Sequence, residues 1–311
     1  MANLLDVRCN IVSITHLIVI DLNVNYFIII INILGGGFKM AARRYTHAIV
    51  CRIPDCFKTN AAELCGEIDL PLARKQHEEL RKVLRDLGVD VIELPPDESQ
   101  PDCVFVEDTA IVCNGTALIC RPGLPTRLKE VDIVRSILKK DMELPIVDIA
   151  NPEAMVDGGD ILFTGKEFFV GLSKRTNDAG ARAVADAFPE FPVTPVKVPG
   201  KHHLKSLLSI AGPDIICVSA SDEAQSVLKR MAQEATYRYQ TVTVPDPEAA
   251  NCLFVNGTLI HRSEFPNSTK VFEDKIDFNK VAIPLSELSK ARGDLSSCCI
   301  LIRKSKYIKK L

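Results

Sequence analysis

The sequence predicts an α/β fold, namely a five-bladed pseudo-symmetric α/β propeller of repeated ββαβ units. Two observations lead to this expectation. The order strand, tight turn, strand, helix, strand returns along the chain from residue 46 onward. The units follow one another at a spacing of about 45–50 residues, a period typical of radially repeated folds. A ring of such units protects its sheet edges and places a site at the central axis.

Hairpin signals mark the second, third and fifth units. Asn114-Gly115 and Asn256-Gly257 each separate two short runs of apolar residues, and Asn-Gly is the strongest short hairpin signal. Thr164-Gly165 separates a third pair of runs. We therefore expect residues 109–113 to pair with 116–120, 161–163 with 168–171, and 252–255 with 258–261. The first and fourth units begin with single strands, at residues 46–52 and 215–219.

A helix and a further strand follow in each unit. In the first helical stretch, Leu80, Val83 and Leu84 recur at helical spacing and share one face. The expected helices cover residues 72–87, 127–140, 177–188, 222–234 and 269–275. The strands after them cover residues 89–94, 145–149, 193–198, 241–244 and 281–285. A late strand at residues 298–302 would then close the ring.

The composition is that of a globular protein, with a single domain expected over residues 40–311. Hydrophobic residues make up 47% and charged residues 25% of the chain, and the net charge is −2. Because nucleic-acid binding needs a clustered positive face, nucleic acid is not expected as a partner. The cysteines are odd in number, 11, and lack the spacing of a zinc site or a disulfide framework. Free thiols in a reducing, cytoplasmic compartment are therefore expected.

Residues 1–39 form an extension that differs from the remaining chain. Residues 17–34 are almost continuously apolar but contain Asp21. One Asp near the middle of a membrane-spanning helix costs about 2.5–3.5 kcal/mol. Gly35-Gly36-Gly37 ends the run, and Met40 opens a segment that reads like a second start. Three interpretations stay open: a non-native or dispensable extension, a membrane or targeting segment, and a folded strand. No stable membrane association is expected unless residues 17–34 are functional.

Two acid-rich segments are candidate sites. Asp102 and the pair Glu107-Asp108 are expected at the two ends of one apolar strand. A planar guanidinium is one partner that binds both oxygens of such a carboxylate. Asp157-Gly-Gly-Asp160 contains two glycines that tolerate unusual backbone angles, and a carboxylate held in such a turn can orient a histidine. A solvated turn is the alternative for both segments.

A histidine, two arginines and a cysteine pair complete the candidates. His203 lies near a loop glycine and is a candidate acid–base for thiol chemistry. Arg127 and Arg175 lie at or before expected helix starts, where the helix dipole opposes them, so each can instead bind a carboxylate bidentately. Cys298 and Cys299 begin an expected strand, so one sulfur would face a cleft and the other the core. Solvation or plain burial is the alternative for each residue.

Five segments, in this order, resemble the dimethylarginine dimethylaminohydrolases of the guanidino-modifying amidinotransferase superfamily. They are Asp102–Asp108, Asp157–Gly165, Phe168–Asn177, His203–Ser206 and Cys298-Cys299. The resemblance covers about residues 44–304. It implies a five-bladed α/β propeller in arginine metabolism and nitric oxide regulation. The implied activity converts N-omega,N-omega-dimethylarginine, and also monomethylarginine, to citrulline and the corresponding amine.

The resemblance also implies a role for each candidate residue. Cys298 would attack the guanidinium carbon and form a covalent intermediate. His203 would protonate the departing amine and then activate water, with Asp157 orienting its ring. The remaining candidates would bind the methylated arginine: Glu107 and Asp108 at the guanidinium, Arg127 and Arg175 at the carboxylate, and Asp102 at an unassigned group. No cofactor or metal is needed for turnover, although Zn²⁺ trapped by Cys298 and His203 would inhibit.

Two other functions stay open. A related deiminase would act on free arginine, and it differs from the dimethylarginine hydrolase in the pocket volume around the ω-nitrogens. A non-catalytic propeller would bind arginine derivatives or zinc through its thiols. The Lys290–Ser297 loop is one residue longer than the family pattern, so its backbone contact to the substrate amine also stays open. The Leu-Lys-Ser match favours His203 over His202 as the catalytic ring.

Overall fold

The structure is a computed structural model that describes residues 12–14, 17–19 and 44–304. The chain divides into two compact units, residues 1–44 and 45–311. In the first unit, strands β1 (Val12–Ile14) and β2 (Leu17–Val19) pair antiparallel. The other residues of the predicted 1–39 extension lie outside the described residues. No helix within these described ranges is long and apolar enough to cross a membrane.

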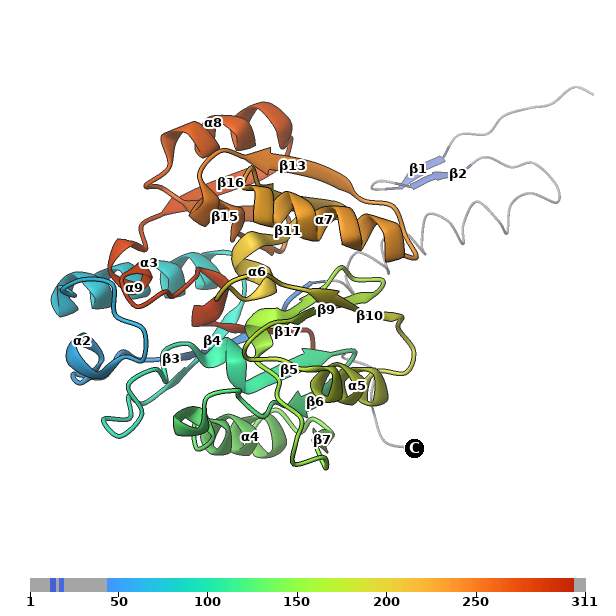
Figure 1. The fold of residues 1–311 in the computed structure, drawn as a ribbon. Coiled ribbons are helices and arrows are strands. Elements are labelled where there is room, and N and C mark those ends of the chain that lie inside the picture. The colour runs from blue at the N-terminus through green and yellow to red at the C-terminus, as the bar shows by residue number, and fades with distance from the viewer. Residues whose placement is uncertain (1–11, 15–16, 20–43, 305–311) are drawn as a thin grey trace, which may run out of the picture. The chain divides into compact units, whose positions relative to one another are not determined.

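Five three-stranded sheets make up the described part of the second unit (Figure 1). The first sheet contains β17 (Ile300–Ile302), β3 (His47–Cys51) and β4 (Asp90–Leu94). The second and third contain β5 (Ala110–Cys113), β6 (Thr116–Ile119), β7 (Ile146–Asp148), β8 (Ile161–Phe163), β9 (Phe168–Leu172) and β10 (Val193–Lys197). The fourth and fifth contain β11 (Leu208–Gly212), β12 (Ile215–Ser219), β13 (Gln240–Val244), β14 (Leu253–Val255), β15 (Thr258–Arg262) and β16 (Asn279–Ile283).

All five sheets share one pairing scheme. The central strand pairs antiparallel with the first strand and parallel with the third. Because a parallel pairing needs a crossover connection, a helix joins the second and third strands of each unit. These helices are α3 (Leu70–Asp86), α4 (Val131–Lys140), α5 (Asp178–Ala187), α7 (Asp222–Glu234) and α8 (Pro266–Lys275). The predicted five-fold ββαβ repeat is therefore confirmed.

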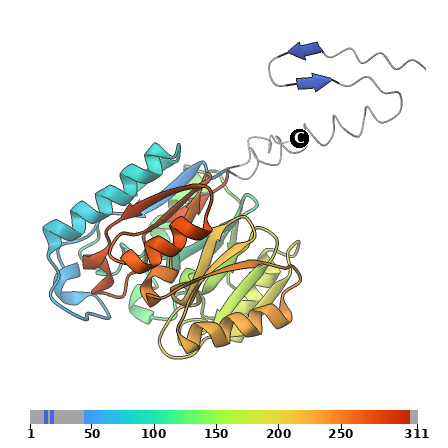
Figure 2. The same cartoon turned by 90° about the horizontal axis from the view of Figure 1, so that it is seen from above.

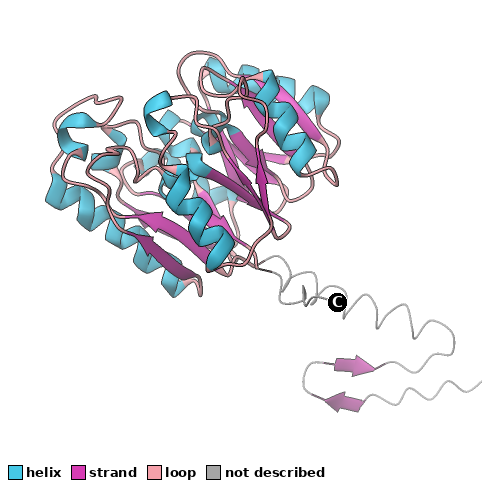
Figure 3. Cartoon of the chain, turned by 90° about the horizontal axis from the view of Figure 1, so that it is seen from below, coloured by secondary structure: helices cyan, strands magenta, loops and turns pink. Residues whose placement is uncertain are grey.

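The crossover helices cover the outer side of the sheets. From above, α3 and α7 lie on opposite outer sides of the molecule (Figure 2), and from below helices flank the strands on the outside (Figure 3). α3 begins where the Asp69 carboxylate accepts a hydrogen bond of 3.0 Å from Leu72 N, and it buries Leu80 and Leu84 against the first sheet's core. The shorter helices are α2 (Phe57–Asn60), α6 (Leu204–Leu207), α9 (Ser286–Ser289), η3 (Gly158–Asp160) and η4 (Pro247–Ala250).

Turn chemistry accounts for two of the hairpins. Asn114 and Gly115 have φ angles of 49° and 80°, and Asn256 and Gly257 have φ angles of 50° and 93°. A type I′ turn needs positive φ at both central residues, which Asn and Gly tolerate better than other residues. The two Asn-Gly hairpins are present as predicted.

Strand β11 was not predicted from the sequence. It pairs antiparallel with β12 and completes the fourth sheet. Four of its five residues are buried. A strand buried on both faces lacks the alternation of apolar and polar residues that reveals a half-buried strand, so the sequence pattern does not distinguish β11.

The two ends of the described second unit complete the first sheet. β17 pairs antiparallel with β3, with Ile300 opposite Ile49. The predicted closure of the ring by a late strand is therefore confirmed. Its start is later than predicted, because Cys298 ends the 3₁₀ helix η5 (Ser296–Cys298) and the strand begins at Ile300.

The predicted strand between Asp102 and Asp108 is wrong. Residues 102–105 form a turn, in which Phe105 N donates to Asp102 O at 2.9 Å, and the 3₁₀ helix η1 (Val106–Thr109) follows. The four apolar residues between the acids are all buried, so their sequence carries no period that would distinguish a strand from a helix. Arg127 also differs from expectation, since it ends the 3₁₀ helix η2 (Pro125–Arg127) ahead of α4.

Candidate active site

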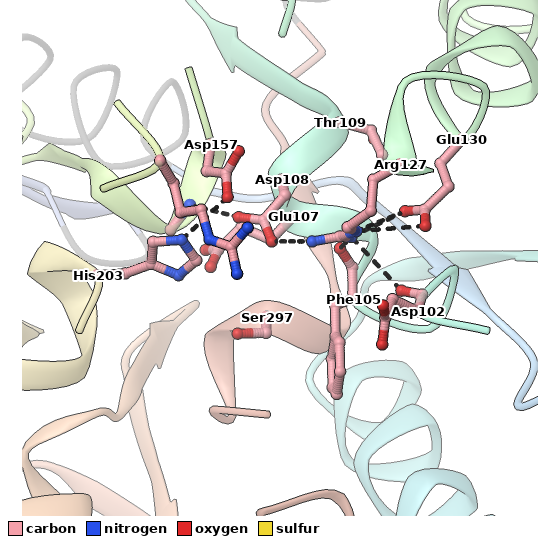
Figure 4. Close-up of polar contacts among 12 residues, drawn as sticks. Asp102, Phe105, Glu107, Asp108, Thr109, Arg127, Glu130, Asp157, His203 and Ser297 are labelled. Atoms are coloured by element: carbon pink, nitrogen blue, oxygen red, sulfur yellow. Dashed lines mark hydrogen bonds and ion pairs between the residues drawn. The ribbon is translucent and has the colours of Figure 1, made fainter. Parts of the chain in front are cut away.

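Short helical segments from different units meet at one place. η1 contacts η3 and η5, and α6 contacts η3. Glu107 and Asp108 lie on η1, Asp157 directly precedes η3, and His203 directly precedes α6 (Figure 4). Cys298 is the last residue of η5. The structure thus brings together candidates from four separate sequence segments.

His203 is held by Asp157. Its Nε2 lies 3.0 Å from Oδ2 of Asp157, whose Oδ1 accepts a hydrogen bond of 2.8 Å from Gly123 N. The Asp157 side chain is 3% exposed and the His203 side chain 23%, so part of the ring stays accessible. Asp160 fixes the helix that follows the ring, because its Oδ1 accepts a hydrogen bond of 2.9 Å from Leu204 N. Two carboxylates therefore set the position of the imidazole.

The surrounding carboxylates keep His203 protonated. Burial alone would lower the pKa of His203, but the negative charges of Asp108, Asp160 and Asp157 outweigh it and raise the pKa to about 10. Asp108 is affected in the opposite sense. Burial raises its pKa, whereas His203 and Arg127 hold the pKa of Asp108 below its ordinary value. At neutral pH the site therefore contains an imidazolium beside the ionised Asp108.

Two glycines let η3 approach the acids and the His203 ring. A Cβ at Gly158 would lie 1.9 Å from Glu107 O, and a Cβ at Gly159 would lie 2.6 Å from His203 Nδ1. Gly159 N also donates a hydrogen bond of 2.9 Å to Oδ1 of Asp108. Neither glycine is among those with positive φ, so neither uses the backbone angles that glycine tolerates. The glycines are needed for close approach instead.

Arg127 lies in a buried network with two acids. Its Nη1 donates to Oδ2 of Asp108 at 2.6 Å, and its Nε and Nη2 donate to the Glu130 carboxylate at 3.0 and 2.8 Å. Nη2 also donates to Phe105 O at 2.9 Å, and the side chain is 7% exposed. Arginine has five N–H donors, and within the described residues one Nη1 hydrogen has no acceptor. Arg127 therefore holds the acids in place and keeps one donor for a further partner.

Glu107 has a separate set of partners. Its carboxylate forms an ion pair with Lys205 and accepts a hydrogen bond of 2.9 Å from Ser296 Oγ. Burial raises the pKa of Glu107 above its ordinary value, and Lys205 opposes this shift. The two neighbouring acids, Glu107 and Asp108, are thus neutralised by different cations, which lets both be buried side by side.

Asn251 joins the histidine segment to the cysteine segment. Its side chain is fully buried. The Nδ2 group donates to Lys205 O and to Ser296 Oγ, and Oδ1 accepts from Ser296 N, each at 2.9 Å. This amide therefore fixes α6, which follows His203, relative to η5, which ends at Cys298.

The Cys298 thiol is buried. Its Sγ lies 3.5 Å from Asp294 O. Burial, together with Cys299 and Glu107, raises the pKa of Cys298 well above its ordinary value. Cys299 is buried as well, and burial raises its pKa too. The expected separation of the two sulfurs between a cleft and the core is therefore wrong, because Cys298 ends a 3₁₀ turn and does not begin a strand. Figure 4 shows Ser297, on this turn, facing Glu107, Asp108 and His203.

Asp102 and Arg175 both contact the loop of residues 61–67. Both carboxylate oxygens of Asp102 lie 3.2 Å from Ala62 N, and burial raises the pKa of Asp102. Arg175 Nη2 lies 2.7 Å from Oε1 of Glu63, and the Arg175 side chain is 20% exposed. Of the two predicted arginines, Arg175 is thus the more accessible.

The sequence analysis missed several residues that support the site. They are Glu63, Glu130, Lys205, Asn251 and Ser296. A local signal existed for Glu130, since it follows Arg127 at a spacing of three residues, and for Lys205, which lies within the His-Leu-Lys-Ser segment. Asn251 and Glu63 carry no local signal, because their partners lie far away in the sequence.

One group of side chains near His203 has donor atoms close enough to hold a metal ion. The donor atoms of Asp108, Asp157 and His203 lie within 4.8 Å of one another. This cluster differs from the expected Cys298 and His203 pair. His203 Nε2 already bonds to Asp157, so a cation would compete with this hydrogen bond.

The fold and the site together define a class of enzyme. An imidazolium held by carboxylates lies beside two adjacent acids, Glu107 and Asp108, and carboxylates can bind a planar cation such as a guanidinium. A sequence model of the family described as N,N dimethylarginine dimethylhydrolase, eukaryotic, matches residues 53–256. The chain belongs to the dimethylarginine dimethylaminohydrolase family.

Known proteins are similar along most of the chain. A human protein with the provisional name hydrolase DDAH2 is 41% identical over 83% of this chain and 95% of its own length. The Pseudomonas aeruginosa N(G),N(G)-dimethylarginine dimethylaminohydrolase is 28% identical over 76% of this chain and 91% of its own. A solved structure of a cysteine-to-serine variant of the Pseudomonas aeruginosa protein, complexed with citrulline, has a TM-score of 0.72 at 26% identity. It covers 83% of this chain and 99% of that chain.

Proposed function

We propose that this protein hydrolyses N-omega,N-omega-dimethylarginine, and also monomethylarginine, to citrulline and dimethylamine or methylamine. One observation carries the proposal: the segments bearing Cys298, His203 and the Glu107-Asp108 pair meet at one place. The citrulline bound to the similar bacterial protein supports it. The reaction needs no cofactor or metal, and Zn²⁺ bound at Cys298 and His203 would inhibit it.

The two ends of the substrate are bound by opposite charges. Glu107 and Asp108 hold the guanidinium, whose planar N–H groups match carboxylate oxygens. At the other end, Arg175 binds the α-carboxylate. Arg127 adds the one Nη1 hydrogen that its buried network leaves uncommitted. Asp102 shapes the wall between the two ends through its contact with Ala62 N.

Substrate binding prepares the first chemical step. On substrate binding, the turn that carries Cys298 brings the thiol, whose sulfur lies 3.5 Å from Asp294 O, to the guanidinium. The cationic guanidinium lowers the pKa of the thiol, which burial had raised, and so favours the thiolate, whose proton passes to solvent. The thiolate then forms a bond to the guanidinium carbon. As the carbon–nitrogen bond to the dimethylamino group breaks, the imidazolium of His203 gives its proton to the departing amine. A covalent thiouronium intermediate remains on Cys298.

Hydrolysis of this intermediate restores the enzyme. His203, now neutral, takes a proton from water as the water oxygen bonds to the guanidino carbon. The second proton of the water passes to the sulfur as the carbon–sulfur bond breaks, and the products are citrulline and the Cys298 thiol, with His203 protonated again. Asp157 keeps the ring oriented through both steps, because its hydrogen bond to Nε2 fixes the rotation of the imidazole.

A direct comparison of substrates tests the proposed function. The purified protein is incubated with dimethylarginine and, separately, with arginine, and citrulline release is measured. We expect faster release from dimethylarginine. Faster release from arginine would instead assign the site to a deiminase. Binding of either compound with no citrulline formed would assign it to a non-catalytic arginine-binding protein.

We also propose a cytoplasmic location. The ten cysteines among the described residues are all free thiols, which fits a reducing compartment. The substrate is a small molecule, and the net charge of −2 gives no support to nucleic acid as a partner. N-terminal sequencing of the native protein tests whether residues 1–39, and with them the apolar run 17–34, belong to the mature chain.

A further inference from the structure

The loop of residues 61–67, in the connection between α2 and α3, lies between two parts of the candidate site. Near its start, Ala62 N lies 3.2 Å from the carboxylate oxygens of Asp102. Further along, Cys65 N donates a hydrogen bond of 2.6 Å to Lys290 O, in the loop that leads to Cys298. Most side chains between these two attachments are exposed, so the loop is fastened to the protein by few contacts.

Glu63 bridges two arginines from distant parts of the chain. Its Oε1 lies 2.7 Å from Arg175 Nη2, and its Oε2 lies 3.1 Å from Arg292 Nε. Arg175 follows β9 in the third unit, and Arg292 lies in the loop before η5. The three side chains are 32%, 20% and 43% exposed, in that order. A single carboxylate thus joins three segments at the side of the site that contains Arg175.

The backbone at Arg292 is shaped for this contact. Arg292 has a φ of 56°, in the left-handed region that costs free energy for a residue with a Cβ. The next residue must be small, because a Cβ at Gly293 would lie 2.2 Å from the Phe105 ring. The chain therefore turns sharply here, at the point where its arginine meets Glu63.

Glu63 presents to Arg175 the same chemical group that the substrate would present. A side-chain carboxylate and the α-carboxylate of an amino acid bind a guanidinium with the same two oxygens. Both cannot occupy the same donors of Arg175 at once. Ion pairs of this partial exposure are weak, so a substrate that also gains contacts at Glu107 and Asp108 can displace Glu63.

We propose that Glu63 is a gate carboxylate that occupies Arg175 in the ligand-free protein and is displaced by the carboxylate of the substrate. This inference rests on the proposed function for the role of Arg175. Its consequence is selectivity for guanidino compounds that carry a carboxylate. A compound without one leaves Glu63 on Arg175 and the 61–67 loop in its closed position. Because the gate competes with the substrate, it weakens apparent affinity by the fraction of molecules that are closed.

The test compares Glu63→Gln with Glu67→Gln. Glu67 is exposed on the same loop, and its side chain forms no ion pair within the part of the chain that the structure describes, so it is a matched control. We expect Glu63→Gln to lower KM for dimethylarginine and Kd for citrulline by about two- to tenfold, with kcat unchanged. Glu67→Gln should leave all three unchanged. Arg292→Gln should shift KM and Kd in the same direction as Glu63→Gln, by a smaller factor.

A ligand without a carboxylate distinguishes displacement of Glu63 from a general change in the site. Inhibition by N,N-dimethylguanidine should be the same for the wild type and Glu63→Gln, because this compound never competes with Glu63. Equal KM and Kd in Glu63→Gln and Glu67→Gln would overturn the proposal. So would an equal gain in affinity for dimethylguanidine and citrulline.

Hydrogen exchange distinguishes failure of the gate from failure of the proposed function. Amides of residues 62–67 should exchange faster in Glu63→Gln than in Glu67→Gln, with no ligand present. Saturating citrulline should raise their exchange in the wild type towards the Glu63→Gln rate. If the wild type forms no citrulline from dimethylarginine, the proposed function fails, and these exchange rates still decide the gate. Exchange that neither Glu63→Gln nor citrulline changes would refute the gate while leaving the activity intact.

Discussion

The pair formed by Asp157 and His203 gives the sharpest prediction, tested by Asp157→Asn. Gly123 N donates to Oδ1 of Asp157, so an asparagine must keep its oxygen there and turn its NH2 group towards His203 Nε2, 3.0 Å away. Two donors would then face each other whenever the imidazole is protonated. The variant also removes one of three carboxylates that, against burial, raise the pKa of His203 to about 10. Loss of one opposite charge at this distance shifts a pKa by about 1–3 units.

The expected pKa of His203 in Asp157→Asn is therefore about 7–9. The assay is the pH dependence of kcat/KM for citrulline release, together with NMR titration of the His203 ring. In the wild type the alkaline loss of activity should follow deprotonation of His203 near pH 10, and in the variant it should move down with the ring's pKa. Asp160→Asn is the control, because Asp160 also raises this pKa but bonds to Leu204 N and not to the ring. If Asp157→Asn lost activity at the same alkaline pH as the wild type, or at a higher pH, the reasoning would be refuted.

Three further predictions concern stability and the thiols. Glu130→Ala should lower the free energy of unfolding by about 3–5 kcal/mol in urea denaturation, because it leaves the buried Arg127 with one acid in place of two. Cys298→Ser should abolish citrulline release, while Cys299→Ser should reduce it only mildly; equal losses would contradict separate roles. His203 has a folded pKa of about 10 against an ordinary 6.5, so its contribution to stability is complete below pH 6.5 and is lost as the pH rises through 10. The unfolding free energy of the wild type minus that of His203→Ala should fall over this range; a constant difference would contradict the raised pKa.

The fold was predictable because its signals are local and repeat. Asn114-Gly115 and Asn256-Gly257 specify hairpins through backbone angles that few other residues tolerate. The crossover helices show a 3.6-residue period because one face is buried and the other is solvated. These signals disappear where a segment is buried on all sides, as in β11 and in the apolar residues between Asp102 and Asp108. Two errors of the sequence prediction, the missed strand β11 and the wrong strand between Asp102 and Asp108, fall on these segments.

The site was predictable only in part, for a related reason. Acids and histidine are conspicuous in sequence because they are costly to bury, and Glu107, Asp157 and His203 come together in the structure. The groups that make their burial possible are not conspicuous. Asn251 meets Ser296 at a sequence separation of 45 residues, and Glu63 meets Arg175 at a separation of 112. Such contacts depend on how neighbouring units pack against each other. No residue pattern within one unit predicts them.

Closure of the ring and assembly of the site depend on the same residues. Two of the buried charge pairs join different units: Glu107 pairs with Lys205, and His203 with Asp157. The turn that carries Cys298 directly precedes β17, the strand that completes the first sheet by pairing with β3. The last segment to join the ring thus brings both the thiol and Ser296, which bonds to Glu107. Without this last segment, the acids and the imidazolium would lack some of their partners. Unpaired buried charge would then destabilise the protein. The propeller therefore stabilises a site that no single unit could hold.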